Sequence, residues 1–111
     1  MRKLAVFVAG VLLFGGAWTS VAMGEDGKAL YTKSCVSCHG AAGKGGEGPA
    51  LNNKVLLAAA TDTYLVETIS RGRRNTAMQG FLKPSIIWPA LTRAEIESIV
   101  AYIRSWEGKK S

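Results

Sequence analysis

The sequence has few of the residues that usually carry chemistry. It contains two cysteines and one histidine, and all three lie between Cys35 and His39. Two cysteines are too few for a disulfide-dense mini-protein, and the chain has no repeat of a collagen-like kind. With 20% charged and 48% apolar residues, the composition also excludes an intrinsically disordered chain.

The sequence also lacks any sign of a β-sheet. After the first 24 residues, no run alternates apolar and polar residues with the period of two that a strand shows. Repeats and low-complexity segments are absent as well. A chain of 111 residues has room for one domain. We therefore expect a single all-α domain, over residues 25–107.

The segment from Leu4 to Met23 contains no charged residue and follows Arg2 and Lys3. Small residues at Ser20 to Ala22 match a leader-peptidase site, which predicts a signal peptide over the first 22 residues. The alternative is an uncleaved membrane anchor, because about 20 uncharged residues form a helix of roughly 30 Å. Both alternatives export the rest of the chain, so we expect a periplasmic domain, soluble or anchored.

The exported part holds about 88 residues, a size at which small hydrophobic cores become marginal. A bound group could therefore be needed to complete the core. Without the leader, 12 basic and 8 acidic residues remain, a net charge of +4. This mild basicity suits acidic protein partners or anionic surfaces.

Four helices are expected in the exported part, at Lys28 to Ser37, Lys54 to Ala60, Thr61 to Gly72 and Arg93 to Trp106. Asp26 would start the first helix and Thr61 the third. The last begins with a capping box of Thr92 and Glu95, carries an apolar stripe and stops at Gly108.

Two other segments are expected to be irregular. Gly40 to Pro49 contains five glycines and no apolar residue larger than alanine, so it is expected to wrap around another group rather than to form a core. Arg71 to Pro89 is broken by glycines and prolines.

The spacing Cys35-Val36-Ser37-Cys38-His39 is the attachment signature of c-type haem. Two thiols three residues apart on one helical turn can add to the two vinyl groups of one porphyrin, and the adjacent histidine can face the iron. The sequence therefore predicts one haem c, held through two thioethers.

Three kinds of site besides haem attachment use cysteines at this spacing, and each fits the chain less well. A structural zinc ion needs a fourth nitrogen or sulfur ligand, which the chain does not offer. A thioredoxin-like dithiol needs a preceding strand, and none is visible. A simple disulfide would leave His39 without a role and would close too short a loop to stabilise much.

From Glu25 to Trp106 the sequence resembles the class I, single-haem c-type cytochromes of bacteria. Gly27 and Tyr31 match positions at which that family packs its N-terminal helix against its C-terminal helix, and Ile99 and Tyr102 match the opposing contacts. The resemblance implies the cytochrome c fold, with these two helices crossing beside the haem. It also implies that the carbonyl of Pro49 accepts a hydrogen bond from the His39 imidazole.

His39 can supply only one axial bond to the iron. Met1 and Met23 lie in or beside the leader, which leaves Met78, in a Thr-Ala-Met sequence that resembles the family's ligand loop. Gln79 replaces the proline that usually follows this methionine. The alternative for Met78 is a core residue that fills a gap.

Three features at or after the end of the third helix have open interpretations. By similarity with cytochromes that carry an aromatic donor here, Trp88 could bind a haem propionate through its indole N–H, or it could simply pack. Ile86 and Ile87 could cover the second side of the haem or form a docking surface. The cluster of Arg71, Arg73 and Arg74 could dock partners, neutralise propionates or be a solvated turn.

A His/Met-ligated haem suits one-electron transfer, because both axial positions stay occupied in both oxidation states. The sequence thus predicts an electron carrier, or the non-catalytic cytochrome subunit of a larger oxidoreductase, in an exported respiratory-type chain. Its partners would be redox proteins, with a membrane-bound complex among them, and not nucleic acid. The alternative is a haem enzyme or a gas or redox sensor with a labile sixth ligand.

Overall fold

The computed structural model describes residues 27–108, and all regular elements within this range are helical. The expected all-α fold is therefore confirmed. A first helix covers residues 27–34 and a turn at Cys35 follows. The remaining elements are the short helix α2, the 3₁₀ helix η2, and the helices α3, α4 and α5, at Val36–His39, Ala41–Gly43, Lys54–Ala59, Asp62–Arg71 and Arg93–Arg104. The signal peptide and the Asp26 cap were predicted for residues outside the described range.

The helix at residues 27–34 crosses α5 at close range, as the sequence predicts. A Cβ atom added to Gly27 would lie 2.1 Å from the Ser98 carbonyl oxygen, so only glycine permits this approach. One turn further on, the Tyr31 ring lies 5.5 Å from that of Tyr102 and 5.4 Å from that of Trp106, measured between centroids. This aromatic cluster fastens the two helices together.

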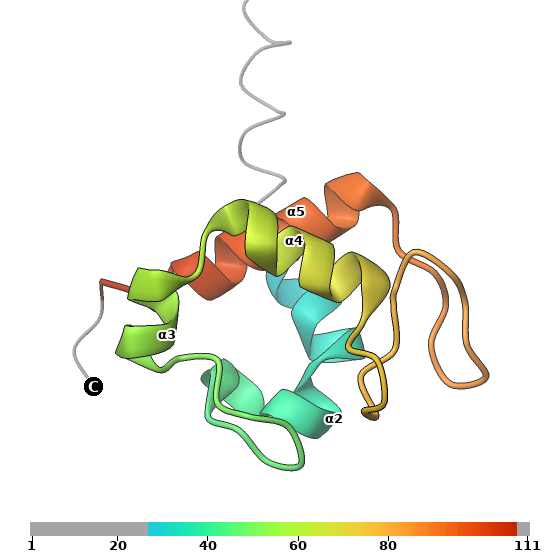
Figure 1. Cartoon of the computed structure of the whole chain (residues 1–111), viewed down its shortest axis with the longest axis horizontal. Coiled ribbons are helices and arrows are strands. Elements are labelled where there is room, and N and C mark those ends of the chain that lie inside the picture. Colours follow the sequence, from blue (N-terminus) through green and yellow to red (C-terminus); the bar gives the residue numbers. More distant parts are fainter. Residues whose placement is uncertain (1–26, 109–111) are drawn as a thin grey trace, which may run out of the picture.

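Helix α4 packs along α5 on the side of the molecule away from α2 (Figure 1). Leu65, Val66 and Ile69 of α4 are buried, because they share one face of the helix. Fully buried side chains of α5 complete this core, namely Ile96 and Ile99.

One side chain ties α3 to the far end of α5, a role that the sequence did not reveal. Arg104 donates hydrogen bonds to the carbonyl oxygens of Leu57 and Ala60, which close the end of α3. Its Nε also lies 2.6 Å from a carboxylate oxygen of Asp62, at the start of α4. A single guanidinium therefore fixes the junction of three helices.

The helix boundaries follow the predicted caps, with two corrections. Thr92 and Glu95 form the expected capping box. However, α5 ends at Arg104 rather than Trp106, because the backbone tightens there, with the Trp106 N–H bonded to the Ile103 carbonyl at 3.1 Å. The first helix is likewise interrupted at Cys35, whose carbonyl accepts from the N–H groups of both Cys38 and His39.

Candidate functional site

The Cys35–His39 sequence forms one helical turn. Cys35 is the residue immediately before α2, while Cys38 and His39 are the last residues of that helix. The two cysteines form no disulfide with each other, and both are half-buried. The turn therefore presents two thiols and an imidazole from five consecutive residues, as attachment of one porphyrin requires.

The imidazole of His39 is held by the loop that follows it. Its Nδ1 atom lies 2.8 Å from the Pro49 carbonyl oxygen. Because a carbonyl only accepts hydrogen bonds, this contact places the proton on Nδ1 and leaves the Nε2 lone pair free. A Cβ atom on Gly48 would lie 2.9 Å from the ring carbon Cε1, so the loop backbone rests directly against the imidazole.

Backbone hydrogen bonds join this loop to the Cys35–His39 turn. The N–H of Gly45 donates to the His39 carbonyl at 2.6 Å, and that of Gly48 donates to the Cys38 carbonyl at 2.8 Å. At the start of the loop, the Tyr31 hydroxyl donates to the Gly40 carbonyl at 2.7 Å. The orientation of His39 is thus tied, through Tyr31, to the crossing of the first helix with α5.

The surroundings of Cys35 do not suit a thioredoxin-like dithiol. Burial raises the pKa of its thiol to about 12, with a smaller contribution from the nearby Cys38. Dithiol exchange needs a thiolate at neutral pH, which this burial disfavours. Moreover, no three His, Cys, Asp or Glu side chains within residues 27–108 converge to hold a metal ion.

Met78 lies in the irregular segment after α4, and both of its backbone groups are bonded. Its carbonyl accepts from the Arg73 N–H at 3.1 Å, and its N–H donates to the Thr76 hydroxyl at 3.2 Å. The half-buried side chain packs against the hydrophobic core. Although Gln79 replaces the rigid proline of the family, hydrogen bonds on the preceding residue restrain this loop.

Two glycines that the sequence pattern marks only as breaks bring Met78 against the end of α4. A Cβ atom on Gly72 would lie 2.5 Å from the carbonyl carbon of Gln79, and one on Gly80 would lie 2.7 Å from that of Arg71. The φ angle of Gly72 is +77°, in the region that favours glycine. The sequence feature that could have indicated this position of Met78 is the pair of glycines, Gly72 and Gly80, on either side of it.

Two buried polar atoms near this loop have no hydrogen-bond partner within the described chain, the Ser70 hydroxyl oxygen and the Gln79 amide nitrogen. A buried polar group without a partner costs free energy, typically about 1–3 kcal/mol. Haem carries carboxylate groups that can accept hydrogen bonds. The residues present therefore fit a bound haem, both in attachment chemistry and in unused polar groups.

Trp88 and its two neighbours differ in burial. The Trp88 ring is half-buried and packs against Phe81, with centroids 5.9 Å apart. Ile86 and Ile87, in contrast, are exposed to solvent. Of the two interpretations open for these isoleucines, their exposure favours the docking surface.

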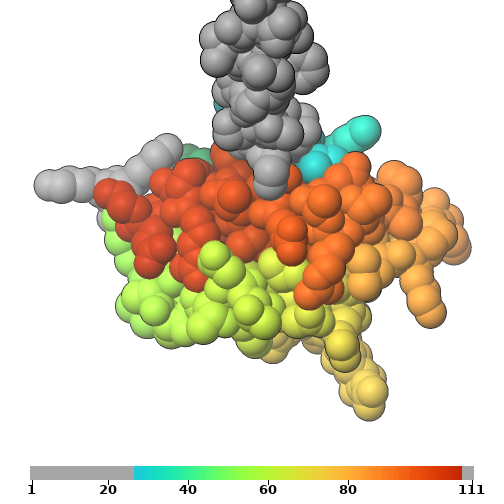
Figure 2. All heavy atoms as spheres, turned by 90° about the horizontal axis from the view of Figure 1, so that it is seen from above, coloured from blue at the N-terminus to red at the C-terminus, as the bar shows by residue number. Residues whose placement is uncertain are grey.

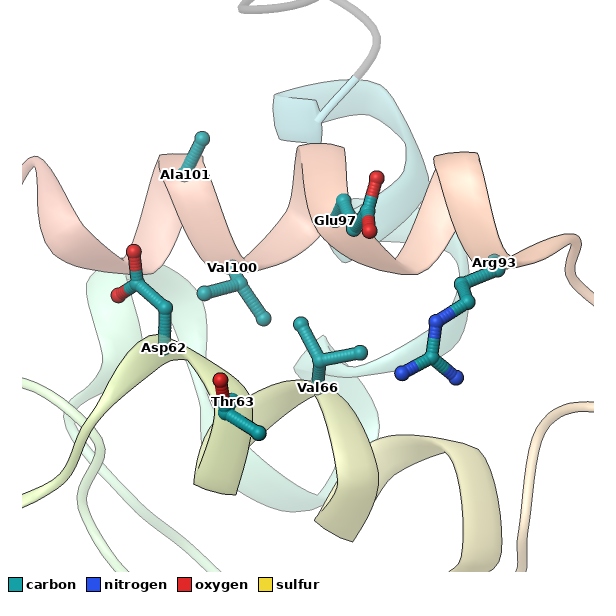
Figure 3. Close-up of a pocket in the computed structure, with 7 residues that line it drawn as sticks. All are labelled: Asp62, Thr63, Val66, Arg93, Glu97, Val100 and Ala101. Atoms are coloured by element: carbon teal, nitrogen blue, oxygen red, sulfur yellow. The ribbon is translucent and has the colours of Figure 1, made fainter.

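A further pocket of about 340 Å³ lies between α4 and α5, and not at the attachment turn. Figure 3 shows Val66 and Val100 facing each other across it, with Asp62 and Arg93 at its two ends. The pocket contains no cysteine, histidine or methionine. The pocket lies between α4 and α5, and none of the predicted haem-site residues lines it.

An all-helical fold, with crossing terminal helices and a Cys-x-x-Cys-His turn beside a glycine-rich loop, defines a single-haem c-type cytochrome. The family model for cytochrome c matches residues 24–107. The chain belongs to the cytochrome c family.

Three relatives illustrate this membership. The chain is 34% identical over 89 residues to the cbb3-type cytochrome c oxidase subunit FixP of Bradyrhizobium diazoefficiens, covering 76% of this chain and 28% of that subunit. It is 35% identical over 84 residues to cytochrome c55X of Stutzerimonas stutzeri, covering 73% and 74% of the two chains. The crystal structure of cytochrome cL from Methylophaga aminisulfidivorans matches with a TM-score of 0.62 and 32% identity, over 76% of this chain and 53% of that one.

The chain thus spans less than a third of the length of the oxidase subunit that it matches. As a member of the family, it carries covalently bound haem c. Within residues 27–108, no helix is long and apolar enough to cross a membrane.

Proposed function

We propose that this protein transfers single electrons through a haem c attached to Cys35 and Cys38, with His39 and Met78 as the axial ligands. The observation that carries the proposal is the 2.8 Å contact between His39 Nδ1 and the Pro49 carbonyl, which leaves Nε2 free to bind iron. The bound haem supplies a one-electron couple, and a thioether ligand favours its ferrous form.

The protein's part in this function is to hold the ligands in place. Pro49 fixes the tautomer and orientation of His39 and increases its basicity as a ligand. The hydrogen bonds of the Met78 backbone keep the thioether positioned in both oxidation states, which limits reorganisation. Trp88 is the proposed donor to a haem propionate, through its indole N–H, with its ring supported by Phe81.

The proposed location is the periplasm, and the proposed setting is a respiratory-type electron transport chain. The charge pattern of the leader supports export. The similarity to an oxidase subunit supports a role beside a membrane-bound oxidoreductase, as its cytochrome subunit or as a mobile carrier. Gel filtration of the native protein separates these two roles, since a subunit elutes with its complex.

The second candidate is a haem enzyme or a gas or redox sensor, and Gln79 in place of proline is the observation that favours it. Such a protein needs a sixth position that ligands can enter. An electron carrier instead keeps that position occupied.

Three measurements on the purified holoprotein test the proposal. A potentiometric titration should follow a reversible one-electron curve, and the haem should resist extraction with acidified acetone. Addition of carbon monoxide to the reduced protein should leave its spectrum unchanged. Rapid binding of carbon monoxide without denaturant would favour the sensor or enzyme instead.

A further inference from the structure

The loop between Phe81 and Leu91 exposes aliphatic side chains that a small domain would normally bury. Ile86 is fully exposed, Ile87 is 71% exposed and Leu82 is 45% exposed. In the space-filling view this segment projects from one end of the molecule (Figure 2). Grouped exposed aliphatic residues mark interaction sites more often than chance surface positions do.

Hydrogen bonds hold this loop in a defined conformation. The Ser85 hydroxyl accepts hydrogen bonds from the N–H groups of Ile87 and Trp88, at 3.1 Å and 3.0 Å, and the Ser85 N–H donates to the Trp88 carbonyl at 2.9 Å. Trp88 anchors the turn on the buried ring of Phe81. The two isoleucines are therefore held outward in a defined conformation, which reduces the entropic cost of binding.

The charge around this loop has one sign. From Thr68 to Ala94 the sequence contains five basic residues and no acidic one. Among residues 27–108, no carboxylate lies within ion-pair distance of Arg73, Arg74 or Lys83, whereas Arg71 and Arg93 both pair with Glu67. Three positive charges without an ion-pair partner in the described part of the chain thus accompany the exposed aliphatic residues.

Backbone contacts tie the two segments that carry the basic and apolar groups to the end of α4. The Leu82 N–H donates to the Ser70 carbonyl at 3.3 Å, so the loop starts against the last turn of that helix. The Arg73 N–H donates to the Met78 carbonyl, which places this arginine against the proposed ligand. We call the group the α4-end surface; it consists of Arg73, Arg74, Leu82, Lys83, Ile86 and Ile87.

We propose that the α4-end surface docks a redox protein that presents an apolar patch bordered by carboxylates. The inference rests on the proposed electron-transfer function. Ile86 and Ile87 would enter the apolar patch, while Arg73, Arg74 and Lys83 would attract the carboxylates. A partner bound here lies against the segment that contains Met78, and electron transfer needs such proximity. A lipid surface would share the charge pattern but could not exchange electrons with the haem.

Stopped-flow oxidation of the reduced full-length holoprotein tests the proposal, with an acidic blue-copper protein and a cationic one as the probes. We expect Arg74→Glu with Lys83→Glu to slow oxidation by the acidic probe about tenfold at low salt, and to lose this effect as salt increases. Ile86→Ser with Ile87→Ser should weaken binding of the acidic probe about fivefold at any salt concentration. All substituted side chains are exposed, so the fold should survive.

Matched changes elsewhere provide the controls. Lys28→Glu with Lys54→Glu makes the same change in net charge on other exposed positions, and Val55→Ser removes an aliphatic side chain that is 78% exposed on α3. Neither control should alter the rate with the acidic probe beyond the general effect of net charge. Equal losses from the control and test variants would overturn the proposal.

Two further readouts separate the possible failures. Co-sedimentation with vesicles of phosphatidylglycerol and phosphatidylcholine tests the lipid alternative, and binding that depends on Ile86 and Ile87 without any effect on the acidic probe would overturn protein docking. The midpoint potential and haem spectrum of each variant report on the site itself. If the wild-type protein shows no reversible one-electron couple, the proposed function fails. If the wild-type protein shows this couple but the surface variants are oxidised by the acidic probe as fast as the wild type, the docking proposal fails.

Discussion

The crossing of the first helix with α5 and the loops around the proposed haem site are stabilised by different contacts. In the crossing, Tyr31 and Ile99 are almost completely buried, and aromatic rings interlock. In the loop at residues 40–53, Gly43 alone is buried, and the backbone is held mainly by hydrogen bonds to its own turns. The helices can thus supply part of their own core, whereas the loops depend on the group that they surround.

The strongest test of this contrast removes the haem attachment. We expect Cys35→Ala with Cys38→Ala to abolish covalent haem binding and leave a largely unfolded chain, because about 88 residues with glycine-rich loops bury too little apolar surface alone. Circular dichroism during heating should show no cooperative transition. Ser37→Ala, at the exposed position between the cysteines, should keep both haem and fold. A cooperative transition in the double variant would show that the helices suffice.

The second test removes the proposed ligand from the loop after α4 and leaves the helices unchanged. Met78→Ala should lower the midpoint potential and allow carbon monoxide to bind the ferrous haem, because the thioether is lost from the sixth position. Carbon monoxide difference spectra measure this directly. The control Gln79→Ala should remain unreactive toward carbon monoxide.

The third test disturbs the crossing of the first helix with α5. Gly27→Ala should destabilise the holoprotein by about 3 kcal/mol, since the new methyl group would meet the Ser98 carbonyl, and backbone cannot easily yield. Gly108→Ala provides the control, because a Cβ atom there meets nothing within 4 Å. Guanidinium unfolding followed by haem absorbance measures both. Equal stability of the two variants would contradict the tight crossing.

The sequence predicted these two regions unequally well. The Thr92–Glu95 capping box, the Thr61 cap and the Gly27 crossing follow from local chemistry or family resemblance, and all are present. The outward position of Ile86 could not be predicted, because an apolar side chain in an irregular segment fits a core or a surface equally. The bonds from Arg104 to α3 join residues more than 40 positions apart, which no local pattern reveals.

A smaller effect is expected where the chain departs from its family. Gln79→Pro should leave the haem unreactive toward carbon monoxide and change stability by no more than about 1 kcal/mol, because Met78 is already held by Arg73 and Thr76. The Gln79 N–H, which proline lacks, makes no backbone hydrogen bond within residues 27–108. Carbon monoxide titration and thermal unfolding of the holoprotein test this expectation.

The smallest expected effect concerns the surface ion pairs of α4. Arg93, and to a lesser extent Arg71, lowers the pKa of Glu67 in the folded protein. Its carboxylate therefore stabilises the fold above its unfolded pKa, and this contribution is lost as the pH falls through the lowered value. Glu67→Gln should slightly reduce the thermal midpoint at neutral pH, and not at all in strong acid or high salt. A reduction that persists in high salt would indicate lost packing instead.

The assignment of the sixth ligand is tested most directly by the ferric absorption spectrum. A sulfur-to-iron bond gives a weak absorption band at the red end of the visible spectrum. The substitution Met78→Gln keeps the length of the side chain while removing its sulfur. We predict that the band is present in the wild-type protein and in a Met23→Gln control and absent in Met78→Gln. A band that persists in Met78→Gln would show that Met78 is not the ligand.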